Sequence, residues 1–138
     1  MSRALILALA AVPVAAVAGG DLRGIVELSR IDLARFADAT PALTHDGPIV
    51  GAAARLVPQK GLDVLVDAAP AVLERHPDAR FVLAGEGPSR AELEEQARGL
   101  PFEFLGHRAD VPEVIASFDV FVLPSFFEGL VYAVIEAQ

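Results

Sequence analysis

Two cationic side chains bracket a proline-containing turn. Arg55 and Lys60 stand five residues apart, with Pro58 between them and an apolar, helix-like pattern behind them. Both side chains could converge on one phosphate group, because the free N–H groups and the dipole of a helix start also favour an anion. Solvated surface cations that flank a turn are the common alternative. The spacing alone leaves both interpretations open.

Two carboxylates near the end of the chain have a spacing that could serve a sugar. Glu128 and Glu136 are eight residues apart. Carboxylates accept hydrogen bonds from hydroxyl groups, so a pair can hold a sugar or a ribose. A helix turns about 100° per residue, which brings residues eight apart to within roughly 80° of each other. Glu128 in a loop and Glu136 on the following helix are therefore expected to face one cleft, although the spacing by itself carries little weight.

Two glycine-containing turns could bring backbone close to a ligand. Gly85 and Gly87 flank a glutamate, and Gly106 precedes His107. Glycine permits tight turns and close approach of a ligand. The first turn is not the dinucleotide fingerprint G-x-G-x-x-G, because Arg90 occupies the place of the third glycine, and a simple helix-entry turn is the alternative. His107 could act in catalysis or contact a base or phosphate, but a solvated loop histidine is the common case.

A regular alternation of short apolar runs and amphipathic segments begins at residue 48 and must position these side chains. The expected strands are residues 49–56, 81–84, 102–105 and 120–123, and the expected helices are 62–76, 89–98, a short one from 110 and one from about 129. Such alternation predicts an α/β fold, a doubly wound parallel sheet with helices on both faces. Ligands of these sheets lie outside the carboxyl ends of the strands, so the residues just after each strand are the informative ones.

Local signals refine the helix starts. Ser89 and Glu92 have the spacing of a capping box. Asp110 opens the short helix, with Pro112 tolerated in its first turn. Residues 41–48 are predicted to be a linker or loop, because they begin and end with proline and lack periodicity.

Composition limits the class of partner. The chain has 138 residues, a formal net charge of −8 and no cysteine. That length fits one domain. The negative charge argues against a nucleic-acid binder but not against a small anionic ligand, which needs only a few local cations. Without cysteine there are no disulfides or thiolate metal sites, and no His, Asp or Glu cluster has the spacing of metal ligands.

The N-terminal apolar run has two interpretations. It follows Arg3, extends from Ala4 to Ala18 and ends in an A-x-A sequence, which is typical of a secretory signal peptide. The run is too short to span a bilayer comfortably. A buried strand or helix broken at Pro13 is the alternative. Residues 1–29 are therefore predicted to be either a signal-like segment or the remnant or first strand of the fold, and residues 30–138 the main domain.

Five motifs in order resemble the GT-B-fold retaining glycosyltransferases, family four and its relatives. They are IDLARF at 31–36, ARLVPQKGLD at 54–63, FVLAGEGP at 81–88, FLG at 104–106, and PSFFEG at 124–129 followed by Glu136 and Ala137. The resemblance covers roughly residues 30 to 138 and points to the C-terminal, nucleotide-sugar-binding domain of that Rossmann-like fold. Because the family's donors are cytosolic, it favours a cytoplasmic protein over an exported one.

The resemblance also implies roles for the candidate residues. Arg55 and Lys60 would neutralise the donor diphosphate, including the charge that develops as it leaves. Glu128 would contact the transferred sugar, which completes an implied catalytic set of three. Glu136 would hold the ribose hydroxyls.

The glycine turns receive supporting roles from the same resemblance. Gly85 and Gly87 would let backbone approach the nucleotide, and the loop at Gly106 and His107 would lie near the base. The class usually needs no metal and no cofactor besides the nucleoside-diphosphate-sugar donor. A sugar or lipid acceptor would be held by an N-terminal domain, and the full enzyme could associate peripherally with a membrane.

The chain departs from the family pattern at three places. Ala54 stands where a glycine often precedes the loop arginine, Val131 stands where glycine or proline is frequent, and the sequence ends at Gln138, where the family continues. The domain is therefore expected to be incomplete at its C-terminus, and the chain alone to bind donor without transferring sugar. The alternatives are a GT-B-fold epimerase or phosphorylase and a non-catalytic nucleotide-sugar-binding module.

Overall fold

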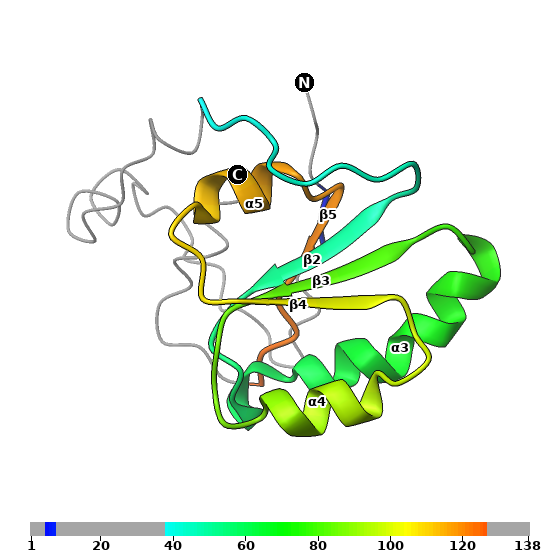
Figure 1. The fold of residues 1–138 in the computed structure, drawn as a ribbon. Coiled ribbons are helices and arrows are strands. Elements are labelled where there is room, and N and C mark those ends of the chain that lie inside the picture. Colours follow the sequence, from blue (N-terminus) through cyan, green and yellow to red (C-terminus); the bar gives the residue numbers. More distant parts are fainter. Residues whose placement is uncertain (1–4, 8–37, 127–138) are drawn as a thin grey trace, which may run out of the picture.

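A five-stranded parallel sheet forms the centre of the molecule (Figure 1). The computed structural model describes residues 5–7 and 38–126. The strands are β1 Leu5–Leu7, β2 Ile49–Ala53, β3 Arg80–Ala84, β4 Phe102–Gly106 and β5 Val120–Val122. Their order across the sheet is β1-β5-β2-β3-β4, and every neighbouring pair is parallel. A strand thus forms within the N-terminal apolar run and pairs with β5.

Helices cover both faces of the sheet (Figure 1). The helices α3 Leu62–Arg75 and α4 Arg90–Gln96 lie on one face, and α5 Val111–Ala116 lies on the other. This arrangement follows from right-handed crossovers: β2 to β4 are added in one direction, whereas α5 returns the chain to the opposite side of β2. The α/β doubly wound parallel sheet predicted from the alternation is confirmed.

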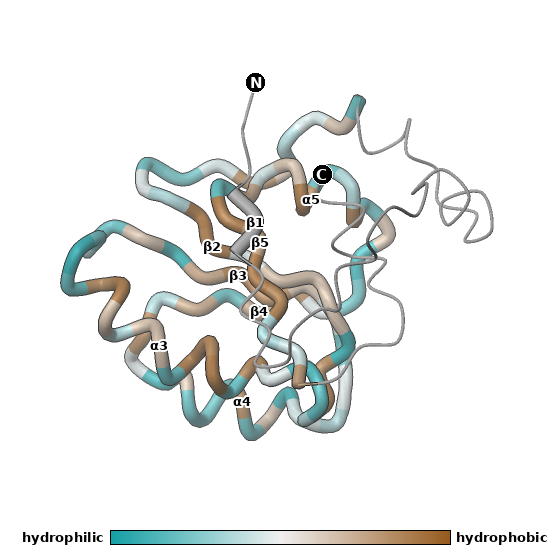
Figure 2. The backbone as a smooth tube through the Cα atoms, turned by 180° about the vertical axis from the view of Figure 1, so that it is seen from behind, coloured by the Kyte–Doolittle hydropathy of each residue, from teal (hydrophilic) through white to brown (hydrophobic). Residues whose placement is uncertain are grey.

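The core has two halves, one on each face of the sheet. Along β3, Phe81 and Leu83 pack toward α3 and α4, whereas Val82 and Ala84 pack toward α5. All four side chains are buried, because successive residues of a strand point to opposite faces and both faces are covered. This explains why β3 is apolar from Phe81 to Ala84, and brown segments mark the apolar residues of the central strands in Figure 2.

Three predicted details were wrong or inexact. The strand expected at residues 49–56 is β2, which ends at Ala53. By Leu56 the chain has already turned, and the amide of Leu56 pairs with the loop after β3. The helix expected to reach residue 98 ends at Gln96. The capping box is absent: Ser89 has helical backbone angles and its side chain makes no capping hydrogen bond. Its amide donates instead to Leu56 of the neighbouring loop.

Other predicted boundaries agree closely. The helix expected at 62–76 is α3, which ends at Arg75, and α5 follows Asp110 with Pro112 in its first turn. The helix expected from about 129 lies outside the described residues. Among the described residues, no helix has the length and apolar character needed to cross a membrane.

The segment before β2 is held against α5. Residues 41–48 form no helix or strand, as the linker prediction requires. The amide of Ala42 donates to the carbonyl oxygen of Glu113 at 3.0 Å, and the amide of Leu43 donates to Ser117 Oγ at 2.9 Å. These two bonds satisfy backbone donors that would otherwise depend on water.

Candidate functional site

The topology identifies one edge of the sheet as the place for a ligand. The chain leaves β2 toward β3 on one side, while β5 occupies the other side of β2. In open parallel sheets the loops diverge at such a reversal, and ligands bind outside the carboxyl ends of the strands there. The loop after β2 and the loop after β5 flank this position.

The loop after β2 carries both predicted phosphate-binding cations. Arg55 is exposed and Lys60 is half-buried. Between them the chain forms a single 3-10 turn, η1 Pro58–Lys60, because proline suits the first turn and Gly61 can end it with a φ of 61°. The 14-residue helix α3 begins directly after Gly61. The two cations therefore lie on one loop that leads into a helix N-terminus, as the sequence predicts.

The loop after β5 packs directly against this turn. A Cβ atom on Gly61 would overlap the carbonyl oxygen of Pro124. The amide of Phe126 donates to the carbonyl oxygen of Gln59 at 2.9 Å. The β2 and β5 loops, which flank the topological reversal, are thus joined through backbone atoms.

The loop after β3 is joined to the other side of the β2 loop. The amide of Leu56 donates to the carbonyl oxygen of Glu86 at 3.0 Å. Cβ atoms on Gly85 and Gly87 would overlap the carbonyl oxygens of Ala54 and Leu56, respectively. The two glycines are required for this contact between loops. Their predicted role in letting backbone approach a nucleotide stays a prediction.

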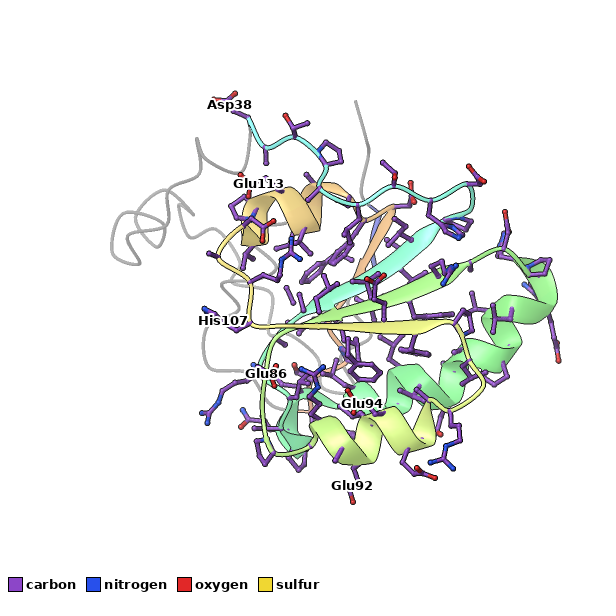
Figure 3. The ribbon with its side chains drawn as sticks, viewed as in Figure 1. Asp38, Glu86, Glu92, Glu94, His107 and Glu113 are labelled. Atoms are coloured by element: carbon purple, nitrogen blue, oxygen red, sulfur yellow. The ribbon has the colours of Figure 1, made fainter. Side chains whose placement is uncertain are left out.

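The end of β4 is tied into the same group of loops. Gly106 has a φ of 70°, and its carbonyl oxygen accepts a 2.8 Å hydrogen bond from the amide of Gly85. His107 follows as an exposed side chain. Figure 3 shows His107 and Glu86 at the same edge of the sheet, where the strands end.

An arginine connects the β3 loop, α4 and β4. Arg90 forms an ion pair with Glu86 and a 2.8 Å ion pair with Glu94. It also donates to the carbonyl oxygen of Phe104 at 3.5 Å. The hydrogen bond to Glu94, together with the charges of both glutamates, raises the pKa of Arg90 against the opposing effect of desolvation. In the sequence Arg90 stands out only as the residue that breaks the glycine fingerprint. The i, i+4 spacing of Glu86, Arg90 and Glu94 is the signal that predicts the network.

A second charge pair shapes the loop after His107. Arg108 Nε and Nη2 donate to the two carboxylate oxygens of Asp110 at 2.7 and 2.6 Å. The hydrogen bond from Arg108 is the main cause that lowers the pKa of the Asp110 carboxyl, and desolvation opposes it in part. The carboxylate makes no capping bond to α5. Asp110 was predicted only to open the helix, and its pairing with Arg108 was not predicted.

Six of the eight predicted site residues therefore lie at or after the carboxyl ends of β2, β3 and β4. The loops that carry them contact one another. They are Arg55, Lys60, Gly85, Gly87, Gly106 and His107. The remaining two, Glu128 and Glu136, lie outside the described residues. No group of three His, Asp or Glu side chains that could hold a metal ion occurs within residues 38–126.

A hollow of about 500 Å³ lies on the helical side of the β2 loop. Apolar side chains of Val57, Leu62, Leu93 and Phe126 line it, and Glu92 is among its acidic groups. Neither cation of the β2 loop lines this hollow. It is therefore separate from the predicted phosphate site.

Comparison with known proteins identifies the family of the chain and agrees with its fold. A family model described as "Glycosyl transferases group 1" matches residues 47–138. The GDP-mannose-dependent alpha-(1-6)-phosphatidylinositol dimannoside mannosyltransferase of Mycobacterium tuberculosis is 38% identical over 125 residues, covering 86% of this chain and 31% of that protein. The chain spans about a third or less of the length of the curated relatives it matches.

Solved structures show the same architecture, and these neighbours are GT-B glycosyltransferases. HepE from Anabaena, solved with UDP and glucose, is 25% identical with a TM-score of 0.58, covering 86% of this chain and 31% of that one. The C-terminal domain of LpcC, a group 1 family glycosyl transferase from Francisella tularensis, is 26% identical with a TM-score of 0.61, covering 78% and 65%. Since the family model spans well over half of the sequence, the chain belongs to the group 1 glycosyl transferases.

Proposed function

We propose that this domain binds the nucleoside-diphosphate-sugar donor of a retaining glycosyltransferase and holds the diphosphate with Arg55 and Lys60. The observation that carries the proposal is the position of both cations on the β2 loop, beside the topological reversal of the sheet and ahead of α3. The α3 dipole adds to the positive potential at this loop. Charge-assisted hydrogen bonds from the two side chains contribute about 1.5–3 kcal/mol each.

The same cations would assist the chemical step. When the bond between the sugar and the diphosphate breaks, negative charge builds on the leaving phosphate oxygen. Arg55 and Lys60 would stabilise that charge, and such preorganised electrostatic stabilisation is often the largest catalytic contribution. With two cations in this role, a divalent metal ion is not required. We assign Glu128 to the transferred sugar and Glu136 to the ribose hydroxyls on the family resemblance alone.

The class of donor follows from the relatives. The mycobacterial relative is named as GDP-mannose-dependent, and the Anabaena neighbour was solved with UDP and glucose. A hexose on a nucleoside diphosphate is therefore the proposed donor for this domain. Transfer to a sugar or lipid acceptor is proposed for the whole enzyme, which uses cytosolic donors and associates peripherally with a membrane if its acceptor is a lipid.

A binding experiment tests the donor assignment. A ligand that binds only the folded state adds about 2.7 kcal/mol of stability at a concentration 100 times its Kd. Thermal unfolding of the chain is measured with GDP, UDP and ADP, and with the matching nucleosides as controls. At least one diphosphate is expected to raise the Tm, and its nucleoside to raise it less. Unchanged Tm values with all three diphosphates would contradict the proposal.

The stereochemical assignment needs the complete enzyme. Donor is turned over in the presence of candidate acceptors, and the anomeric configuration of the product is determined by NMR. Retention is expected. An inverted product would refute the retaining mechanism while leaving the donor-binding assignment intact.

A further inference from the structure

Glu86 is a carboxylate held in place at the edge where the strands end. Its Oε1 forms the ion pair with Arg90. Arg90 is itself held by Glu94 at 2.8 Å and by the carbonyl oxygen of Phe104 at 3.5 Å. A Cβ atom on Gly106 would lie 2.7 Å from Glu86 Oε1, so the carboxylate lies against the turn that ends β4. Groups from α4 and β4 thus determine where this carboxylate lies: Arg90 and the Gly106 turn contact it, and Glu94 and the Phe104 carbonyl hold Arg90.

One side of this carboxylate remains open to a ligand. The Glu86 side chain is 51% exposed. The hydrogen bond from Arg90 uses Oε1, and within the described part of the chain no donor contacts Oε2. Glu86 lies at the edge of the sheet that also presents His107 (Figure 3). An ionised carboxylate accepts hydrogen bonds and donates none, so its ligand must present donors.

We propose that Glu86, oriented by Arg90 beside the β4 turn, accepts hydrogen bonds from the base of the bound nucleotide and selects guanine. This inference rests on the proposed function, which supplies the nucleoside diphosphate but leaves its base open. In the proposed function the diphosphate lies beside Arg55, against the loop after β2. The loops after β3 and β4 lie successively farther from the β2–β5 reversal, so a nucleoside that extends across them reaches Glu86 and His107.

The donor pattern of the bases favours guanine. Guanine presents the N1–H and the 2-amino group side by side, and a carboxylate can accept from both. Uracil has a single N–H between two carbonyl oxygens, whose lone pairs oppose a carboxylate. Adenine and cytosine each place a ring nitrogen acceptor next to the amino group. A carboxylate held in a fixed position therefore discriminates among bases. It pairs with both donors of guanine, whereas the other bases place an acceptor atom against it, which it repels.

Arg90 makes a carboxylate tolerable near a diphosphate. An isolated glutamate in this position would repel the phosphates and rotate among several conformations. The ion pair with Arg90 offsets the negative charge and restricts the side chain, which lowers the entropy lost when a base binds. Arg90 is thus a positioning residue, whereas Glu86 makes the contact.

The test compares ligands that differ by one group on the full chain. Calorimetry measures the binding of GDP, inosine diphosphate (IDP) and UDP; IDP lacks only the 2-amino group of guanine. A bidentate contact of this kind discriminates by about tenfold or more. Wild type is expected to bind GDP about tenfold more tightly than IDP or UDP. Glu86→Gln is expected to bring GDP and IDP within about twofold of each other, because the amide opposes one of the two donors.

A matched control separates this effect from a general one. Glu92→Gln makes the same chemical change on α4, at an exposed residue away from the β4 turn, and it is expected to keep the preference for GDP. Circular dichroism and the Tm of each variant report folding. The ratio of GDP to IDP affinity in wild type tests the proposal even if Glu86→Gln fails to fold.

Three results would overturn the inference, and only one of them would also contradict the proposed function. Equal binding of GDP and IDP by wild type would show that no acceptor reads the 2-amino group. If Glu86→Gln lost the same affinity for all three diphosphates, the carboxylate would contact the ribose or have a structural role. Failure of wild type to bind any diphosphate would remove the proposed function together with this inference.

Discussion

The amide of Leu56 donates a 3.0 Å hydrogen bond to the carbonyl oxygen of Glu86. Leu56 is the neighbour of Arg55, so this bond joins the cation-bearing loop to the loop that carries the ligand-facing carboxylate. The spacing between the two loops is set by backbone before any ligand arrives. Such preorganisation reduces the ordering cost of binding and keeps the groups in register for reaction.

Lys60→Ala is expected to weaken binding of a nucleoside diphosphate by about tenfold or more while sparing the nucleoside, because the lost charge-assisted hydrogen bond contributes about 1.5–3 kcal/mol. Calorimetry with GDP and guanosine, or with UDP and uridine, measures both. Arg75→Ala, at the far end of α3, is the control that removes a cation without touching the loop. An equal loss for diphosphate and nucleoside would show that Lys60 does not contact the phosphates.

Binding of the diphosphate is expected to be insensitive to removal of divalent metal. In the proposed function, Arg55 and Lys60 take the place of the positive charge that Mg²⁺ provides in other phosphate sites. The Kd is measured with EDTA and with added Mg²⁺, and the two values should agree within about twofold. Loss of binding in EDTA would mean that the two cations are insufficient and that a metal completes the site.

Gly61→Ala is expected to destabilise the fold more than Gly99→Ala. Both glycines have positive φ, 61° and 80°, so each substitution costs about 1–2 kcal/mol of backbone strain. At Gly61 the added Cβ also overlaps the carbonyl oxygen of Pro124, whereas at Gly99 no atom lies within 4 Å. Overpacking adds about 1–3 kcal/mol.

Urea denaturation of the two alanine variants measures this difference directly. Equal free energies of unfolding would show that the loop after β5 yields to the extra atom. In that case the contact between Gly61 and Pro124 is not a constraint on the β2 loop.

Arg108→Gln is expected to raise the pKa of Asp110 toward its ordinary value of 3.8, because the hydrogen bond from Arg108 is the main cause of its lowering. NMR titration of the carboxyl carbon measures this. A carboxyl with a lowered pKa in the folded state stabilises the protein above its ordinary pKa. That contribution is lost as the pH falls through the lowered value, so the variant should lose less stability than wild type on acidification below 3.8. An unchanged pKa in the variant would assign the lowering to another group.

The fold was largely predictable because burial on both faces of the sheet leaves a strong pattern. The runs around Phe81 and Val120 are continuous and apolar, and parallel strands covered by helices require that. Residues outside the regular elements were predicted less well. Leu56 looks like the last residue of a strand, yet its backbone pairs with a loop that is distant in sequence, and no local pattern reports such pairing.

In the candidate site, too, features with a distinctive local sequence signal were predicted, and features without one were not. Arg55 and Lys60 were predicted to share one loop because a cation pair around a proline turn is a local signal, and both lie in the loop after β2. Their contact with a phosphate stays a prediction. The network of Arg90 and the pairing of Arg108 with Asp110 were missed, since charged residues at short spacing are common on solvated helices and loops. The capping box at Ser89 failed for a related reason: the correct residue types were present, but a long-range backbone contact determined their geometry.

The backbone links among the β2, β3, β4 and β5 loops are made by amides, carbonyls and glycine α-carbons, whereas the ion pair of Glu86 with Arg90 is a side-chain link between the β3 loop and α4. Positions 55 and 107 can therefore change residue type without altering the backbone links that hold their loops in place. Substitutions at these exposed positions change the groups offered to a ligand, while the glycines that contact neighbouring loops keep the loops in place. In these loops the backbone atoms keep the shape, and the exposed side chains are the part that can change.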